Sequence, residues 1–214
     1  MDTQLTNLQA LLRYPAVKWL LILNIILFPV GLVIGGGEDF RAVGLIPFSF
    51  IEQLQSGHLF DCLTGLIRHQ FFHVDMTHLF GNMLFLLAVG LSLEYTLGTR
   101  RFLALYLVCG MLSGIGLVLF SPNLIFPLVG ASGAIAGLMG ATLVLTREQP
   151  LGELPIIHFT VRAKHVIVVW LLWQFELLFQ ALGNPLAGQM VVHITGLAAG
   201  YAIASFWKSR LIAE

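Results

Sequence analysis

The chain has 214 residues, of which 57% are hydrophobic and only 10% are charged. Soluble domains carry about 25% charged residues, so this composition excludes an ordinary water-soluble domain and predicts a surface that faces lipid. The formal net charge is zero, so we expect the lipid bilayer and not a nucleic acid as the chain's surroundings.

Uncharged segments long enough to cross a membrane begin near the N-terminus. A helical span needs about 20 predominantly apolar residues. Residues 19–36 are the first such segment, and residues 1–18 before it are predicted to be a short cytoplasmic segment. The span exceeds the apolar region of about 7–15 residues in a signal peptide, so we expect it to be retained. Residues 77–93 form the second predicted span.

The connection at residues 37–76 is the longest one outside the predicted spans. Its apolar residues recur at roughly helical spacing, which predicts helices that lie partly in the membrane interface. These residues are Phe48, Ile51, Leu54, Leu59, Leu63 and Leu66.

The remainder of the chain predicts four more spans. Residues 102–146 contain no charged residue. This uncharged segment is long enough for two spans with a turn at residues 121–127. Residues 165–207 contain a single charge, Glu176, and predict two further spans with a turn at residues 184–185.

The predicted fold is therefore all-α, a bundle of six transmembrane helices over residues 19–207 with a cytoplasmic tail at residues 208–214. If the spans alternate in direction, all lysines and arginines fall on one side except Arg41 and Arg68. Positive charge concentrates on the cytoplasmic side, so we expect both termini there. The absence of an organelle transit signal favours a bacterial inner membrane.

Four polar side chains lie within the predicted spans: His78 and Asn82 in the second, Ser132 in the fourth and His193 in the sixth. Polar groups inside a membrane are costly and indicate either function or hydrogen bonding between helices. Ser132 and His193 each precede the next inner cation by 15 residues, about 22 Å of helix. The two residues are therefore predicted to lie at the same depth.

These side chains suit acyl transfer. Serine is a weak nucleophile until a base takes its proton, and histidine is the usual base near neutral pH. We therefore predict Ser132 and His193 as the catalytic pair. His78 and Asn82 share one helix face and can donate hydrogen bonds to an oxyanion. The backbone N–H of Ser132, at a helix N-terminus, is the third predicted donor.

Small residues follow both predicted catalytic residues. Ala136 and Gly140 lie at steps of four after Ser132, and Gly196 and Gly200 follow the predicted base. Small residues let membrane helices pack backbone to backbone. The pattern predicts that the two helices are in close contact.

Each polar residue also has a structural interpretation, because serine, histidine and asparagine can hydrogen-bond within or between membrane helices. Glu176 is either a third catalytic member or a local hydrogen-bonding group, and we leave it out of the site. His73, five residues before His78, is placed to brace the site. The other histidines lack metal-ligand spacing, so neither a metal nor a cofactor is expected.

Four patterns resemble those of the rhomboid family of intramembrane serine proteases, and together they cover most of the chain from about residue 66 to residue 200. The Gly-x-Ser-Gly pattern alone is weakly specific, but the presence of all four patterns in the order of the family makes the resemblance specific. They are His73-x4-His78-x3-Asn82, Glu94-x3-Gly98-Thr99-Arg100, Gly130-Ala131-Ser132-Gly133 and His193-x2-Gly196-x3-Gly200.

The resemblance implies a Ser132–His193 dyad without a carboxylate, and an oxyanion hole lined by His78, Asn82 and the Ser132 N–H. It implies a water-filled cavity open to the outer side and single-span membrane proteins as substrates. It also implies that the pattern at Glu94 is structural and ties a helix end to the next turn.

The fifth helix of such proteins acts as a substrate gate, and its aromatic residues suit that role here. Ordinary packing against lipid is the alternative for each of them. They are Trp170, Trp173, Phe175 and Phe179.

Two positions depart from the family pattern. Ala136 stands where many members carry an aromatic residue that packs on the histidine, which leaves the orientation of His193 to other neighbours. The Trp-Arg pair of the first outer loop is missing, and Ile67-Arg68 is its nearest counterpart.

Two other functions compete with proteolysis. An inactive rhomboid-like protein would bind membrane helices without cutting them, but such relatives usually lack the serine or the histidine. A transporter or channel would line a path with polar groups or show a repeat, and the chain has neither feature.

Overall fold

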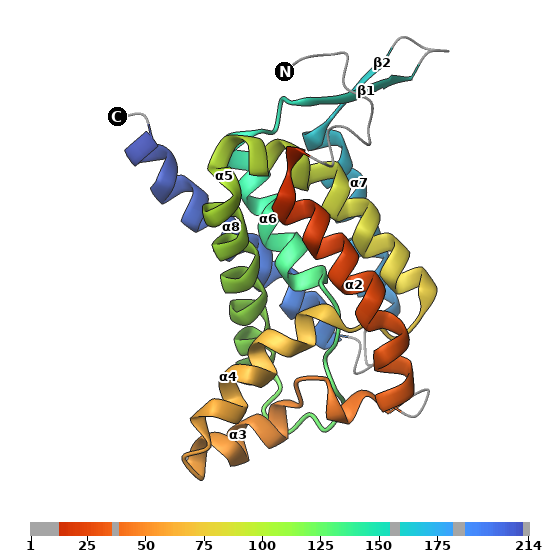
Figure 1. Ribbon diagram of the computed structural model, residues 1–214, viewed down its shortest axis with the longest axis vertical. Helices are drawn as coiled ribbons and strands as arrows, with labels where there is room; N and C mark the ends of the chain where they lie inside the picture. Colours follow the sequence, from red (N-terminus) through yellow and green to blue (C-terminus); the bar gives the residue numbers. More distant parts are fainter. Residues whose placement is uncertain (1–12, 36–38, 155–158, 182–186, 212–214) are drawn as a thin grey trace.

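The computed structural model describes residues 13–35, 39–154, 159–181 and 187–211 (Figure 1). The turn expected at residues 184–185 lies outside this part of the chain. The elements, in chain order, are α2 (Pro15–Ile34), the 3-10 helix η1 (Phe40–Ala42), α3 (Pro47–Gln55), α4 (Leu59–Arg68), the 3-10 helix η2 (His69–Phe71), α5 (Met76–Phe120), α6 (Ser132–Leu145), β1 (Pro150–Leu154), β2 (Phe159–Arg162), α7 (Ala163–Ala181) and α8 (Ala187–Leu211).

The helices have the length and the surface of a membrane bundle. Among the described residues, three helical segments are long and apolar enough to cross a bilayer, namely Pro15–Ile34, Met76–Phe120 and Gly188–Ser209. Large apolar side chains point away from the bundle, with Val33 81% exposed and Leu119 78% exposed. Exposure of this kind is unfavourable in water, so the protein is an integral membrane protein.

Helix α5 consists of two helical segments that meet at Gly98. This residue has φ 73° and ψ 158°, a backbone conformation that interrupts the helix and that glycine adopts without steric cost. The chain reverses direction there, as the course of α5 in Figure 1 shows. The two segments correspond to the second and third predicted spans.

The buried carboxylate of Glu94 joins this turn to the start of α2. Its two oxygens accept the backbone N–H groups of Ala16 and Val17, each at 2.9 Å, and the Thr99 hydroxyl at 2.8 Å. The first N–H groups of a helix lack intrahelical partners and favour negative charge. The structure thus confirms the structural role expected for Glu94, and it adds the N-terminus of α2 as the partner.

Helix α6 occupies the centre of the bundle. All residues from Gly133 to Thr142 are buried, as expected for a helix that is apolar on every side. Its 14 residues make about 21 Å of helix, shorter than a hydrocarbon core of about 30 Å. Its first turn therefore lies inside the bundle (Figure 1).

Helices α6 and α8 touch through their backbones. A Cβ atom at Gly196 would overlap the carbonyl oxygen of Gly133, and one at Gly200 would overlap the carbonyl oxygen of Gly137. Gly140 also abuts the α8 backbone. The predicted close contact is confirmed, but on α6 it runs mainly through Gly133 and Gly137, which the predicted stripe did not include.

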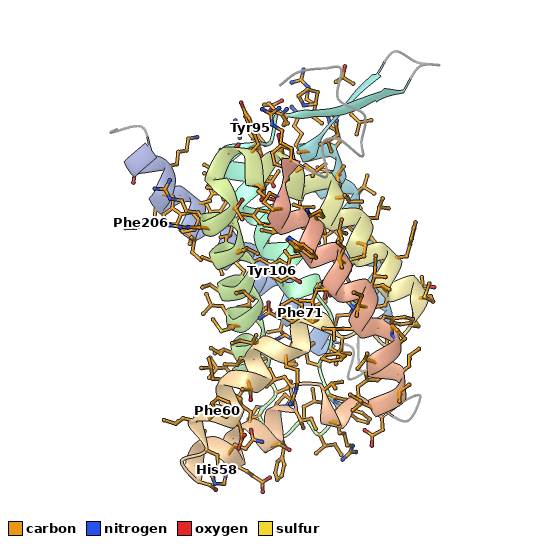
Figure 2. The ribbon with its side chains drawn as sticks, in the orientation of Figure 1. His58, Phe60, Phe71, Tyr95, Tyr106 and Phe206 are labelled. Carbon is orange, nitrogen blue, oxygen red and sulfur yellow. The ribbon has the colours of Figure 1, made fainter. Side chains whose placement is uncertain are left out.

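The connection between α2 and α5 contains α3 and α4, so the helical spacing of its apolar residues is confirmed. His58 and Phe60 lie at the end of this helical pair, far from the centre of the bundle marked by Tyr106 (Figure 2). Phe60 and Leu63 are exposed, which fits the prediction that this pair contacts the membrane interface.

A short antiparallel hairpin, β1–β2, adds to the all-helical fold that the sequence predicts. Its register runs from Pro150 opposite Arg162 to Leu154 opposite Phe159. In Figure 1 it projects from the end of the bundle opposite α3 and α4, the same end where α2 begins and α8 ends. Residues of α2, α8 and the hairpin region predicted to be cytoplasmic thus share one end.

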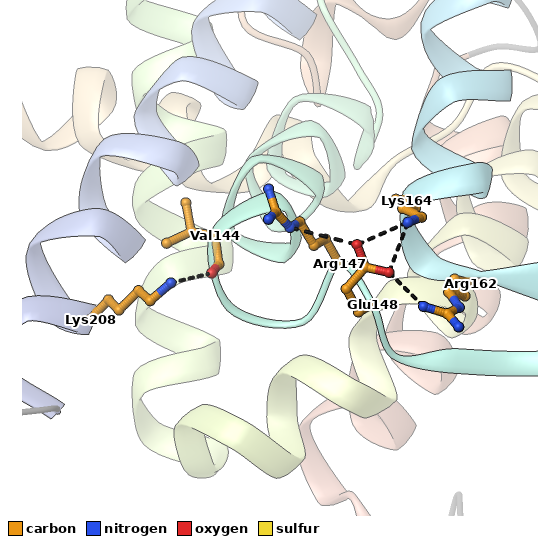
Figure 3. A network of polar contacts seen from close by, with 6 residues as sticks. All are labelled: Val144, Arg147, Glu148, Arg162, Lys164 and Lys208. Atoms are coloured by element: carbon orange, nitrogen blue, oxygen red, sulfur yellow. Dashed lines mark hydrogen bonds and ion pairs between the residues drawn. The ribbon is translucent and has the colours of Figure 1, made fainter.

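A charged network fixes the base of the hairpin (Figure 3). The Glu148 carboxylate accepts hydrogen bonds from Lys164 at 2.8 and 2.9 Å and from Arg162 at 2.7 Å. These hydrogen bonds, first those from Lys164, lower the pKa of Glu148 to about 2. Lys208 donates to the carbonyl of Val144 at 3.3 Å and links the ends of α8 and α6.

We predict that Glu94→Ala lowers the free energy of unfolding by about 2–3 kcal/mol, because it leaves the start of α2 without acceptors. Thermal unfolding in detergent measures the effect. Glu52→Ala, which removes an exposed carboxylate on α3, is the matched control and should leave the midpoint unchanged. An equal midpoint for Glu94→Ala and wild type would contradict the capping role.

Gly200→Val should also destabilise the protein, by about 1–3 kcal/mol, because the new side chain overlaps the Gly137 carbonyl. Ala198→Val adds a side chain of the same kind to the exposed face of α8 and serves as the control. The same unfolding assay applies. If both valine variants unfold with the wild-type midpoint, α6 and α8 are not in backbone contact.

Candidate active site

The segment that leads into Ser132 is held on two sides by the rest of the chain. Leu128 pairs with Leu45 through two backbone hydrogen bonds of 2.8 and 2.9 Å. The Gly130 N–H donates to the carbonyl of His69 at 2.9 Å. Ser132 is then the first residue of α6, so its N–H lies at the helix end where donors are unpaired within the helix.

His73 contacts the residue directly before Ser132. The Ala131 N–H points to His73 Nε2 at 3.5 Å, and the His73 side chain is completely buried. Its ring lies 5.0 Å from the ring of His78, edge to face. The structure thus gives His73 the bracing contact that the sequence led us to expect.

The His78 ring and the Ser132 hydroxyl lie on the same side of Gly130. A Cβ atom built on Gly130 would stand 2.7 Å from His78 Cε1 and 3.8 Å from Ser132 Oγ. The φ of Gly130 is 127°, which side chains disfavour. Both observations require glycine at this position and bring His78 close to Ser132.

Asn82 lies one turn further along α5. Its side chain is buried, and Nδ2 donates to the backbone carbonyl of His78 at 3.0 Å. An amide nitrogen carries two hydrogens, so one donor remains. No hydrogen bond links Asn82 to Ser132 among the described residues.

His193, on α8, is buried against α7, with 4% of its surface exposed. Its Nδ1 lies 2.5 Å from Gln174 Oε1, and its ring lies 5.4 Å from the Trp170 ring, tilted by 56°. Its Nε2 is buried and has no hydrogen-bond partner in the described part of the chain. The two α7 residues thus contact the imidazole that Ala136 leaves without an aromatic neighbour.

Gln174 is the site residue that sequence reasoning missed. The available signal was an amide in an otherwise apolar span, the same signal that selected Ser132 and His193. Its partner lies on another helix, so no spacing within α7 indicates the contact.

Ser132 and His193 lie at the same end of the α6–α8 contact, one on each helix. Ser132 directly precedes Gly133, and His193 is three residues before Gly196, the residue that Gly133 touches. Within the described residues no hydrogen bond joins Ser132 Oγ to His193 Nε2.

The remaining residues considered from the sequence fall outside this cluster. Trp173 is 49% exposed and stacks near Phe85, with ring centroids 6.5 Å apart. The side chains of Phe175, Glu176 and Phe179 lie outside the described part. No group of three or more metal-ligating side chains is found among the residues that were searched.

Known proteins resemble this chain over the region that contains the candidate site. A family model described as the Rhomboid domain matches residues 58–210. The rhomboid protease GluP of Bacillus subtilis (strain 168) is 31% identical over 195 residues, which are 89% of this chain and 34% of GluP. The putative rhomboid protease YdcA of the same organism is 31% identical over 141 residues, 65% of this chain and 64% of that protein.

The rhomboid protease GlpG of Yersinia pseudotuberculosis serotype I (strain IP32953) is 29% identical over 144 residues, 67% of this chain and 48% of GlpG. The chain thus spans between about one third and two thirds of the length of these relatives. The matched domain includes Ser132, His193, His78 and Asn82. On this match, the chain belongs to the rhomboid family.

Proposed function

We propose that this protein is an intramembrane serine endopeptidase that hydrolyses peptide bonds in or near the transmembrane segments of single-span membrane proteins. Ser132 is the nucleophile and His193 is the base. The observation that carries the proposal is the Gly133–Gly196 backbone contact, because it brings the helices of both residues together inside the bundle. The relatives named as rhomboid proteases support the same reaction.

The proposed reaction begins when Ser132 Oγ attacks the carbonyl carbon of the substrate and its proton passes to His193 Nε2. Negative charge develops on the carbonyl oxygen. The backbone N–H of Ser132 and the side chains of Asn82 and His78 donate hydrogen bonds to that oxygen. The unpaired donors at the start of α6 and the second Nδ2 hydrogen of Asn82 support this assignment.

The tetrahedral intermediate then collapses. His193 gives its proton to the leaving amine, and the peptide bond breaks to leave an acyl group on Ser132. Water, deprotonated by His193, then attacks the acyl carbon. The bond between the acyl carbon and Ser132 Oγ breaks, His193 returns the proton to Oγ, and the second product leaves with a new carboxyl group. Hydrolysis needs water within the bundle. The buried Nε2 of His193, which has no partner among the described residues, is the atom to which that water would donate its proton.

Six transmembrane spans follow from the same proposal. They are α2, the two segments of α5, α6, α7 and α8. The concentration of lysine and arginine in the inner connections supports a cytoplasmic location of both termini and an active site toward the outer side of a bacterial inner membrane. The end of the bundle shared by the start of α2, the hairpin and the end of α8 agrees with this orientation.

A fluorophosphonate probe tests the activated serine directly. The wild-type protein in detergent should be labelled, and Ser132→Ala and His193→Ala should each abolish labelling while their thermal unfolding stays close to wild type. A rhomboid protease labelled in parallel controls for the probe. If the folded wild type is not labelled, the proposal fails in favour of a rhomboid-like protein that binds membrane helices without cutting them.

Asn82→Ala should reduce the second-order rate constant of labelling, because the variant loses one donor to the oxyanion. The expected loss is about 2–4 kcal/mol of transition-state stabilisation, roughly a 30- to 1000-fold slower reaction. Ser92→Ala removes a different buried hydrogen bond on α5, from Ser92 Oγ to the Val89 carbonyl, and should label at the wild-type rate. Equal rates for both variants would remove Asn82 from the oxyanion hole.

A further inference from the structure

Over residues 163–174, the part of α7 whose side chains are described, the helix meets the bundle along one face that includes a polar residue. Ala163, Ile167, Trp170 and Gln174 are buried and recur at steps of four, three and four, which places them on one side of the helix. The residues between them include several exposed apolar side chains. A buried amide in a membrane helix is costly unless it is hydrogen-bonded. Gln174 therefore needs a partner, and among the described residues that partner is His193.

The placement of Gln174 Oε1 against His193 Nδ1 favours one tautomer of the imidazole. Gln174 presents Oε1 to His193 Nδ1 at 2.5 Å. A carbonyl oxygen only accepts hydrogen bonds, so a hydrogen bond in this arrangement needs the proton on Nδ1. In a neutral imidazole this leaves the lone pair on Nε2. That is the nitrogen which has no partner in the described structure and which a base would use.

Trp170 supplies a second contact from the same face of α7. It lies four residues before Gln174, so the two side chains are neighbours on the helix surface. The Trp170 ring packs against the imidazole at 5.4 Å between centroids. The hydrogen bond restrains the rotation of the ring, and the indole restrains its plane.

We propose that Gln174 is the positioning residue of this active site, which holds His193 in the Nδ1–H tautomer and leaves Nε2 free to accept the Ser132 proton. The inference rests on the proposed function, since it assigns a partner to the proposed base. In Ser-His-Asp sites a carboxylate holds the tautomer. Here a neutral amide does so without placing a charge in the membrane.

A purely structural role for Gln174 predicts a different response to substitution. If the residue only fills space between α7 and α8, methionine, which matches it in shape and is apolar, should be tolerated better than glutamate. If it acts as an acceptor for Nδ1–H, glutamate should be tolerated better, because it keeps an acceptor oxygen at the same position. The order of the two variants therefore separates the two roles.

The experiment measures fluorophosphonate labelling rates for wild type, Gln174→Met and Gln174→Glu, with Gln55→Met on an exposed position of α3 as the matched control. We expect Gln174→Met to be labelled roughly 10- to 100-fold more slowly than wild type. This loss of rate is smaller than the loss expected when the base is removed in His193→Ala. Gln174→Glu should label within a few-fold of wild type, and Gln55→Met should label at the wild-type rate.

Two results overturn the inference while the proposed function stands. In the first, the wild type is labelled and Gln174→Met is labelled at the same rate. In the second, Gln174→Glu is folded but is labelled as slowly as Gln174→Met. If Gln174→Glu does not fold, nitrogen-15 spectra of histidine-labelled protein decide: His193 should be protonated on Nδ1 in wild type and lose that preference in Gln174→Met. An unlabelled wild type contradicts the proposed function itself.

Discussion

The backbone contact between α6 and α8 is the constraint on which the rest of the site depends. Glycine at 133, 137, 196 and 200 removes the side chains that would separate the two helices. Because the contact begins at the first turn of α6, the distance between the Ser132 and His193 helices is set by atoms that cannot change rotamer. A dyad needs this rigidity, since misplacement of reacting atoms by about 1 Å can cost about 100-fold in rate.

The loop before Ser132 and the imidazole of His193 are positioned by different parts of the chain. The loop is held by the outer connection, through Leu45, His69 and His73. The imidazole is held by Gln174 and Trp170 of α7. The proposed nucleophile and the proposed base can therefore be disturbed independently, and a movement of α7 would change the orientation of His193.

The sequence predicted those features that depend on regular helix geometry. The equal spacing of Ser132 and His193 from the inner cations predicts a common depth because the rise per residue is constant. The Gly133–Gly196 contact shows that the two segments meet. The small-residue stripe was predicted only in part, since the face that a helix turns toward its neighbour depends on its rotation. The contact includes Gly133 and Gly137 beside the predicted Ala136 and Gly140. The loop contacts and the Gln174–His193 pair join distant segments, so local patterns carry no information on them. The hairpin was missed because its strands are too short to show a clear alternation.

The most direct test of the account is a structure of the protein after reaction with a fluorophosphonate. The account predicts phosphorus bonded to Ser132 Oγ and a phosphoryl oxygen within hydrogen-bond distance of the Ser132 N–H and of Asn82 Nδ2 or the His78 ring. His193 should remain against Gln174. An adduct on another residue, or a phosphoryl oxygen directed away from these donors, would contradict it.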